Sequence, residues 1–171
     1  LLGDFFMESK WKKLGRDKQY QLSLWLKGVD LVLMILVLLA FGVFTWYGQT
    51  GVGQNAENIA AYGGFIYVSE VLTLLMLLIF WRVATEIGRD NSFSMENVKH
   101  FRHIGYCAGL ASLGYLIRMI YVIMSKQFTL FRVGYCIFLM IFGLLVLSIC
   151  MILSCLIQNA YEMKQENDLT I

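Results

Sequence analysis

The stretch that decides the fold is LWLKGVDLVLMILVLLAFGVFTWY, residues 24–47. Its central part, residues 31–44, contains no charged side chain. The whole stretch exceeds the roughly 20 residues that a helix needs to cross the hydrocarbon core of a membrane. Trp25 lies near one end and Trp46 and Tyr47 lie at the other, and such aromatic rings settle at membrane interfaces. We therefore predict a first membrane-spanning helix from about Leu24 to Tyr47.

Three further apolar stretches follow, at about residues 64–84, 105–124 and 134–158. Over the whole chain 58% of residues are apolar and 15% are charged, whereas a soluble domain usually carries about 25% charged residues. Proline is absent, and the 15 glycines suit close helix contacts within a membrane. The predicted fold class is all-α: a polytopic membrane protein with a bundle of four transmembrane helices.

The segments outside the spans are short and polar. Residues 1–6 precede Met7, which we take as the natural start, and we treat them as an extension outside the fold. Residues 7–24 mix basic and aromatic side chains and predict an interfacial helix on the cytoplasmic side. Residues 25–158 then form the membrane domain, and residues 159–171 form a polar cytoplasmic tail.

The segment EIGRDNSFSMENVKHFRHIG, residues 86–105, is the most polar part of the chain. Residues 88–91 have the composition of a turn. Ser94 is a good N-cap for a helix that begins near Met95, and Glu96 in its first turn suits the helix dipole. We expect this helix to continue into the third span.

The distribution of Lys and Arg predicts the orientation. Eleven of these residues lie at or outside the ends of the spans on the side of the termini and the middle segment, and two, Lys126 and Arg132, lie on the other side. The positive-inside rule therefore places both termini and residues 86–105 in the cytoplasm. The opposite loop, residues 48–63, carries one acid, Glu57, and no basic residue.

Two ionisable residues lie deep in the predicted spans. Glu70 and Arg118 each lie six residues from the outer end of their helix, or roughly 9 Å below the outer face. Because a charge at this depth is costly without a partner, we predict that they form an ion pair. The pair either fixes the register of the two helices or belongs to a polar ligand site that is open to the outside.

A second charged group lies near the inner ends of the first two spans. Asp30 and Arg82 are predicted at similar depth, and Lys27 lies one helical turn away with a side chain long enough to reach the interface. We interpret Lys27, Asp30 and Arg82 as an inner interfacial cluster that holds the helices at the membrane surface.

No pattern of catalytic, cofactor-binding or metal-binding residues is present. His100 and His103 are three residues apart, but two ligands without a neighbouring Cys are too few for a zinc site. Cys107, Cys136, Cys150 and Cys155 all lie in predicted spans and read as small apolar packing residues. We therefore expect a protein that is not an enzyme and that binds neither a metal nor a cofactor.

The polar segment 86–105, the apolar hairpin after it and the tail ending ENDLTI resemble the bacterial four-helix membrane proteins of the family DUF2975. The resemblance covers about residues 20–171, although the turn is longer than in a tight Gly-x-Pro-Phe pattern and lacks proline. The resemblance implies that the protein lies in the bacterial cytoplasmic membrane. The resemblance also implies a regulatory pairing, since members are often encoded beside a small helix-turn-helix regulator.

Two functions remain open. The first is a membrane regulator that controls such a transcription factor in response to an envelope signal, without contacting nucleic acid itself. The partner contact would use Lys99 and Arg102 in the middle segment, or the tail residues Glu166, Asp168, Leu169 and Ile171; the tail can equally be solvated and idle. The alternative is an envelope sensing or defence protein that binds an amphipathic peptide or lipid from outside. Membrane lipids and further copies of the chain are the other expected partners.

Overall fold

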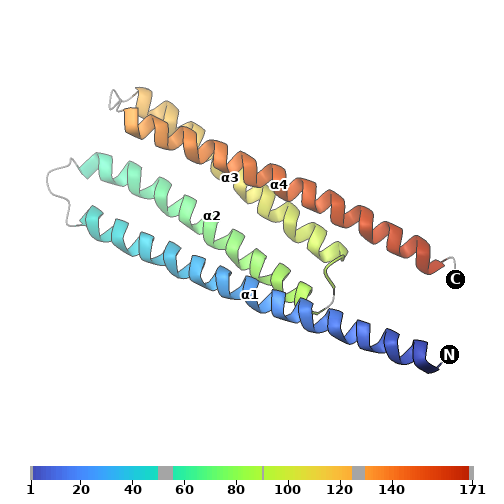
Figure 1. Ribbon diagram of the computed structural model, residues 1–171. Coiled ribbons are helices and arrows are strands. Elements are labelled where there is room, and N and C mark those ends of the chain that lie inside the picture. The colour runs from blue at the N-terminus through green and yellow to red at the C-terminus, as the bar shows by residue number, and fades with distance from the viewer. Residues whose placement is uncertain (1, 50–55, 90, 125–129, 170–171) are drawn as a thin grey trace.

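The computed structural model describes residues 2–49, 56–89, 91–124 and 130–169, and in these residues regular structure is entirely α-helical (Figure 1). Four helices follow one another along the chain: α1 (Leu2–Gln49), α2 (Ala56–Gly88), α3 (Met95–Met124) and α4 (Leu130–Leu169). The predicted all-α class is confirmed.

Each helix contains a stretch that is long and apolar enough to cross a membrane. The stretches are Gly15–Val43, Tyr67–Gly88, Met95–Met124 and Arg132–Asn167. Large apolar side chains cover the outside of all four helices; Trp25 in α1 is 76% exposed and Ile117 in α3 is 67% exposed. Such a surface suits lipid rather than water, so the chain is a multi-pass membrane protein.

The helices are antiparallel to their neighbours along the chain. In Figure 1 the start of α1, the end of α2, the start of α3 and the end of α4 lie at one end of the molecule, here named the terminal end, and the opposite ends of the four helices lie at the far end. α1 packs against α2, α2 against α3, and α3 against α4. Among the described residues α1 packs against neither α3 nor α4, and α2 does not pack against α4. α1 and α4 are therefore the two edges of the helical layer.

Both edge helices extend beyond their partners at the terminal end. Ser23 of α1 lies beside Ala84 of α2, which ends four residues later at Gly88, so the earlier residues of α1 continue past α2. The stretch predicted as an interfacial helix is thus the first part of one continuous helix. α4 likewise continues from Gln158, which contacts Arg102 near the start of α3, to Leu169.

The connection between α2 and α3 is held by hydrogen bonds. Ser94 caps α3 as predicted: its Oγ atom accepts a hydrogen bond from the backbone N–H of Asn97 at 3.2 Å. The side-chain amide of Asn97, which is 1% exposed, donates to the carbonyl oxygens of Asn91 and Ser92 at 3.3 and 3.0 Å. The backbone N–H groups of Arg89 and Asn91 both donate to the carbonyl of Glu86 at 3.1 Å. This network fixes the direction in which α3 leaves the turn.

Candidate functional site

The polar terminal end is the first candidate site, and its centre is Arg102 of α3. The Nε atom of Arg102 donates to Ser154 Oγ at 3.2 Å, and its Nη2 atom donates to Gln158 Oε1 at 2.9 Å. Ser154, which is buried, donates in turn to the carbonyl oxygen of Val98 at 3.2 Å. We name Val98, Arg102, Ser154 and Gln158 the Arg102 cluster; it joins the start of α3 to the base of the α4 extension.

The extension of α4 beyond the Arg102 cluster is polar. Residues 162–167 are exposed, and Gln158 Nε2 donates to Glu162 Oε1 at 2.9 Å, which continues the hydrogen-bond chain along the helix. Of the predicted contact residues, Lys99 and Glu166 are exposed. Asp168 and Leu169 lie in the last turn, where only the backbone is described, and Ile171 lies outside the described residues. The exposed residues that a partner protein could contact thus lie on two helices, Lys99 on α3 and Glu166 on α4.

The α1–α2 contact at the same end is close. The Oγ atom of Ser23 donates to the carbonyl oxygen of Ala84 at 2.5 Å, and both residues are buried. A Cβ atom placed on Gly88 would lie 2.6 Å from Ser23 Oγ, so the last residue of α2 has no room for a side chain. Glycine at this position lets α1 approach the start of the turn.

The structure does not bring the predicted inner interfacial cluster together as a set of ion pairs. Asp30 is 0% exposed, and neither of its carboxylate oxygens has a hydrogen-bond partner. Lys27 is half-buried with its ammonium 5.6 Å from the centre of the Trp81 ring, while Arg82 is exposed. These positions follow from the rotation of α1, which turns Asp30 into the α1–α2 contact and away from the surface.

The predicted ion pair between Glu70 and Arg118 is not formed in this structure, which describes both side chains. The guanidinium carbon of Arg118 lies 5.1 Å from the centre of the Phe65 ring, a cation–π contact. Glu70 is half-buried and its Oε2 atom has no hydrogen-bond partner. Phe65 also meets Tyr115 edge to face, with ring centres 5.1 Å apart. Phe65 is thus a described partner of Arg118, whereas no ion pair joins Glu70 to Arg118.

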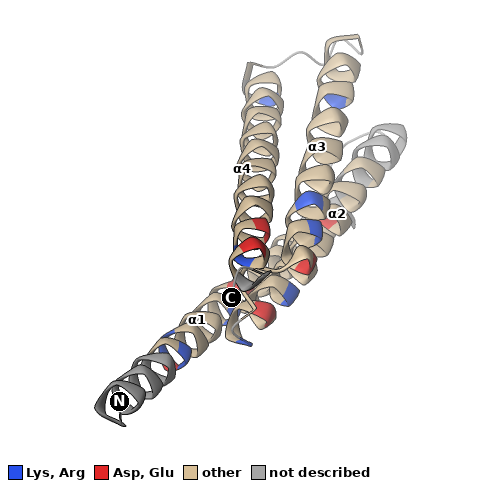
Figure 2. Ribbon diagram, turned by 90° about the vertical axis from the view of Figure 1, so that its right-hand side faces the viewer, with Lys and Arg blue, Asp and Glu red and all other residues tan. Residues whose placement is uncertain are grey.

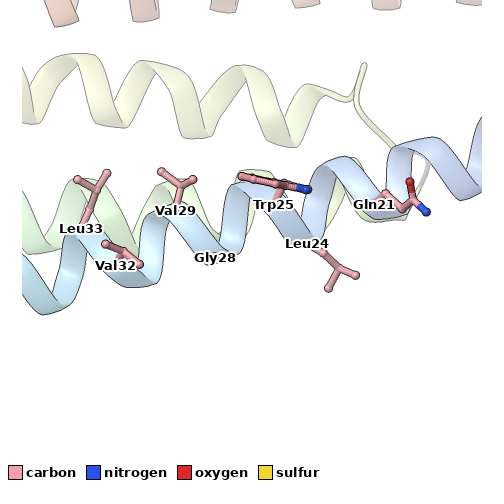
Figure 3. A pocket seen from close by; sticks show the side chains of 7 residues that line it. All are labelled: Gln21, Leu24, Trp25, Gly28, Val29, Val32 and Leu33. Carbon is pink, nitrogen blue, oxygen red and sulfur yellow. The ribbon is translucent and has the colours of Figure 1, made fainter.

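A shallow hollow of about 900 Å³ follows the free side of α1 (Figure 3). Its lining residues recur at helical spacing and are almost all apolar: Gln21, Leu24, Trp25, Gly28, Val29, Val32 and Leu33. Figure 3 shows Trp25, Val29 and Leu33 pointing to the same side of the helix, and Gly28 leaves space between neighbouring side chains. The hollow offers apolar contact and no group for catalysis.

The histidines and cysteines have structural positions. Nδ1 of His100 donates to the carbonyl oxygen of Glu96 at 2.8 Å, and Nδ1 of His103 donates to that of Lys99 at 2.6 Å. The four cysteines are free thiols. Within the described residues no three His, Cys, Asp or Glu side chains gather in a way that could hold a metal ion.

Sequence reasoning missed three residues of the terminal end: Ser23, Ser154 and Gln158. Each lies at the edge of an apolar stretch, where a single polar residue carries little signal by itself. A hydroxyl within a membrane helix usually bonds to its own backbone. Ser23 and Ser154 instead bond to a neighbouring helix, and that choice depends on packing that hydropathy does not reveal.

Four antiparallel helices that can cross a membrane, with most of the charged residues gathered at the terminal end (Figure 2), define the class as a multi-pass membrane protein. Residues 60–171 match the model of the family described as "Protein of unknown function (DUF2975)", and the chain belongs to this family. The match begins within α2 and includes the Arg102 cluster and the tail, but it does not include α1. No curated protein and no solved structure matches the chain.

Proposed function

We propose that the protein is a non-enzymatic membrane regulator that controls a cytoplasmic transcription factor of the helix-turn-helix type in response to an envelope signal. The excess of Lys and Arg at the terminal end supports an orientation with both termini in the cytoplasm of a bacterial cell. The terminal end would then be the surface that a cytoplasmic protein meets.

The observation that carries this proposal is the Arg102 cluster. Arg102 bonds α3 to Ser154 and Gln158, and α4 then continues without a break into the exposed extension. A helix transmits a rotation or a tilt along its length because its backbone is rigid. A change in how α3 and α4 pack in the membrane would therefore alter the position of residues 162–169 in the cytoplasm.

Deleting residues 166–171 tests the tail as the contact. The shortened protein should insert normally and change transcription of its own locus, measured with a reporter in the native cell. The matched control replaces the same six residues with Gly and Ser, which keeps the length but removes the side chains, and it should behave like the deletion. If neither change has an effect, and Lys99→Ala and Arg102→Ala also leave transcription unaltered, the regulator proposal is wrong.

The second candidate is an envelope sensing or defence protein that binds an amphipathic peptide or a lipid from the outer side. The unpartnered Oε2 atom of Glu70, which lies close to the middle of α2 in the half toward the far end, favours it, because a half-buried carboxylate suits a cationic ligand. A fluorescent cationic amphipathic peptide should then bind reconstituted protein and lose affinity with Glu70→Gln. Equal binding to protein-free vesicles would remove the support for this function.

A further inference from the structure

A fully buried carboxyl group lies in the contact between α1 and α2. Asp30 is 0% exposed, and both of its oxygen atoms lack a hydrogen-bond partner. Glu70, the other acid within the apolar part of the helices, is half-buried and has one such oxygen. Asp30 is thus the acid that the structure isolates most completely among the described residues.

The charged side chains near Asp30 make no ion pair with it among the described residues. Ser23 beside Ala84 and Phe41 beside Tyr67 fix the antiparallel register of α1 and α2, and this register places Asp30 about one turn from Trp81 toward the far end. The Lys27 ammonium, one turn away on α1, lies over the Trp81 ring.

The remaining charged groups of α2 are directed elsewhere. Arg82 is exposed, and the Glu86 carboxylate accepts hydrogen bonds from Arg89 and Asn91 at 3.3 and 3.0 Å. The described parts of α3 and α4 do not pack against α1, so they bring no charged group to Asp30. Among the described residues none therefore forms a hydrogen bond or an ion pair with the Asp30 carboxylate.

An ionised carboxylate without a partner costs several kcal/mol inside a membrane protein, and binding a proton removes that cost. We propose that Asp30 is a proton-binding site: its carboxyl carries a proton while α1 is packed against α2, and loss of that proton separates α1 from α2 around this residue. The ligand is a single proton, and no bond other than O–H is made or broken.

The position of α1 makes such a movement feasible. α1 is an edge helix that packs only against α2 among the described elements, so it can shift without disturbing the α3–α4 contact. A shift would break the bond between Ser23 and Ala84 and open the close approach at Gly88. Gly88 adjoins the turn that carries Phe93, which is 57% exposed. Proton release would therefore change the position of this turn at the terminal end.

The first test is chemical labelling. Dicyclohexylcarbodiimide, an apolar reagent, adds to protonated carboxyl groups within membranes and forms a stable N-acylurea that mass spectrometry locates. In vesicles at neutral pH it should label Asp30, the label should be lost in Asp30→Asn, and it should persist in Lys27→Met. No label in the wild type, together with strong label in Lys27→Met, would show that Asp30 is ionised and paired with Lys27, and would overturn the proposal.

The second test measures the opening of α1. The rates of amide hydrogen exchange in residues 19–30 are measured for the wild type and for Asp30→Asn in nanodiscs over a pH series. Dividing the wild-type rate by the Asp30→Asn rate at each pH removes the direct effect of pH on exchange. Where exchange reports the equilibrium between the packed and the open α1, this ratio of rates should rise by up to about tenfold per pH unit, because opening is linked to the release of one proton. A ratio that stays constant with pH would refute the linkage. Both tests are independent of transcription, so they stand apart from the proposed regulatory function.

Discussion

The hydroxyl of Ser23 in α1 donates a hydrogen bond of 2.5 Å to the backbone carbonyl of Ala84 in α2, although the two residues are 61 positions apart in the sequence. A carbonyl oxygen within a helix accepts a hydrogen bond from a backbone N–H of the same helix, and its second lone pair can accept the bond from Ser23. The bond fixes where α1 crosses the end of α2, and it requires the missing side chain of Gly88.

Gly88→Ala should therefore destabilise the protein. The added Cβ atom would lie 2.6 Å from Ser23 Oγ and 2.9 Å from Ser23 Cβ, so α1 must move. Overpacking of this kind costs about 1–3 kcal/mol, and thermal unfolding in detergent should show a lower midpoint. Gly28→Ala is the matched control, since nothing lies within 4 Å of a Cβ atom there.

The same clash predicts a rescue. Combining Gly88→Ala with Ser23→Gly removes both atoms that the new Cβ would meet, so the double variant should be more stable than the sum of the single effects implies. Strictly additive losses would mean that the two residues are not in contact in the membrane.

Arg102→Ala should loosen the α4 extension. It removes the donors to Ser154 and Gln158, a loss of about 1 kcal/mol for side chains in an exposed setting, and hydrogen exchange in residues 159–167 should increase. Lys99→Ala, one turn away and exposed, is the control and should change neither stability nor exchange. Equal exchange in the two variants would show that the cluster does not hold the extension.

Sequence reasoning succeeded where the determining interactions are local. A continuous apolar run decides that a helix can span a membrane, and a serine followed by a helical pattern decides a cap, so the four helices and Ser94 were predictable. Both signals are contained within a few turns of chain and need no knowledge of the neighbouring helices.

The rotation of each helix was not predictable in the same way. Hydropathy gives the depth of Asp30 and Arg118 along their helices, but a helix that is apolar on all sides carries no stripe to show which face meets a neighbour. Depth alone therefore placed Asp30 beside Arg82 at the membrane surface. In the structure Asp30 is buried, whereas Arg82 is exposed. The partners of Arg102 lie 52 and 56 residues away on α4, and no local pattern could reveal them.

The predicted orientation can be measured directly. Eleven basic residues at or outside the span ends on the terminal side against two on the far side predict that a cysteine at Asn91 is hidden from an impermeant thiol reagent in intact cells. A cysteine at Asn55, which lies outside the described residues, should react. Both are placed in a background without the four native cysteines, and the reverse pattern of labelling would overturn the topology.

The last prediction separates two accounts of Arg118. In the structure its guanidinium lies over Phe65 and makes no ion pair with Glu70. A desolvated cation–π contact is worth about 2 kcal/mol, so Arg118→Met and Phe65→Leu should each lower the unfolding midpoint in detergent. Their double variant should lose less than the sum, since each change removes the same contact.

Glu70→Gln supplies the contrast, because it removes the charge and keeps the shape. If Phe65 is the partner of Arg118, Glu70→Gln should leave stability nearly unchanged and should show no coupling to Arg118→Met. Breaking a buried ion pair instead costs about 3–5 kcal/mol, and removing both charges together restores much of that loss. Strong destabilisation by Glu70→Gln, relieved by Arg118→Met, would show that the ion pair predicted from the sequence forms in the membrane after all.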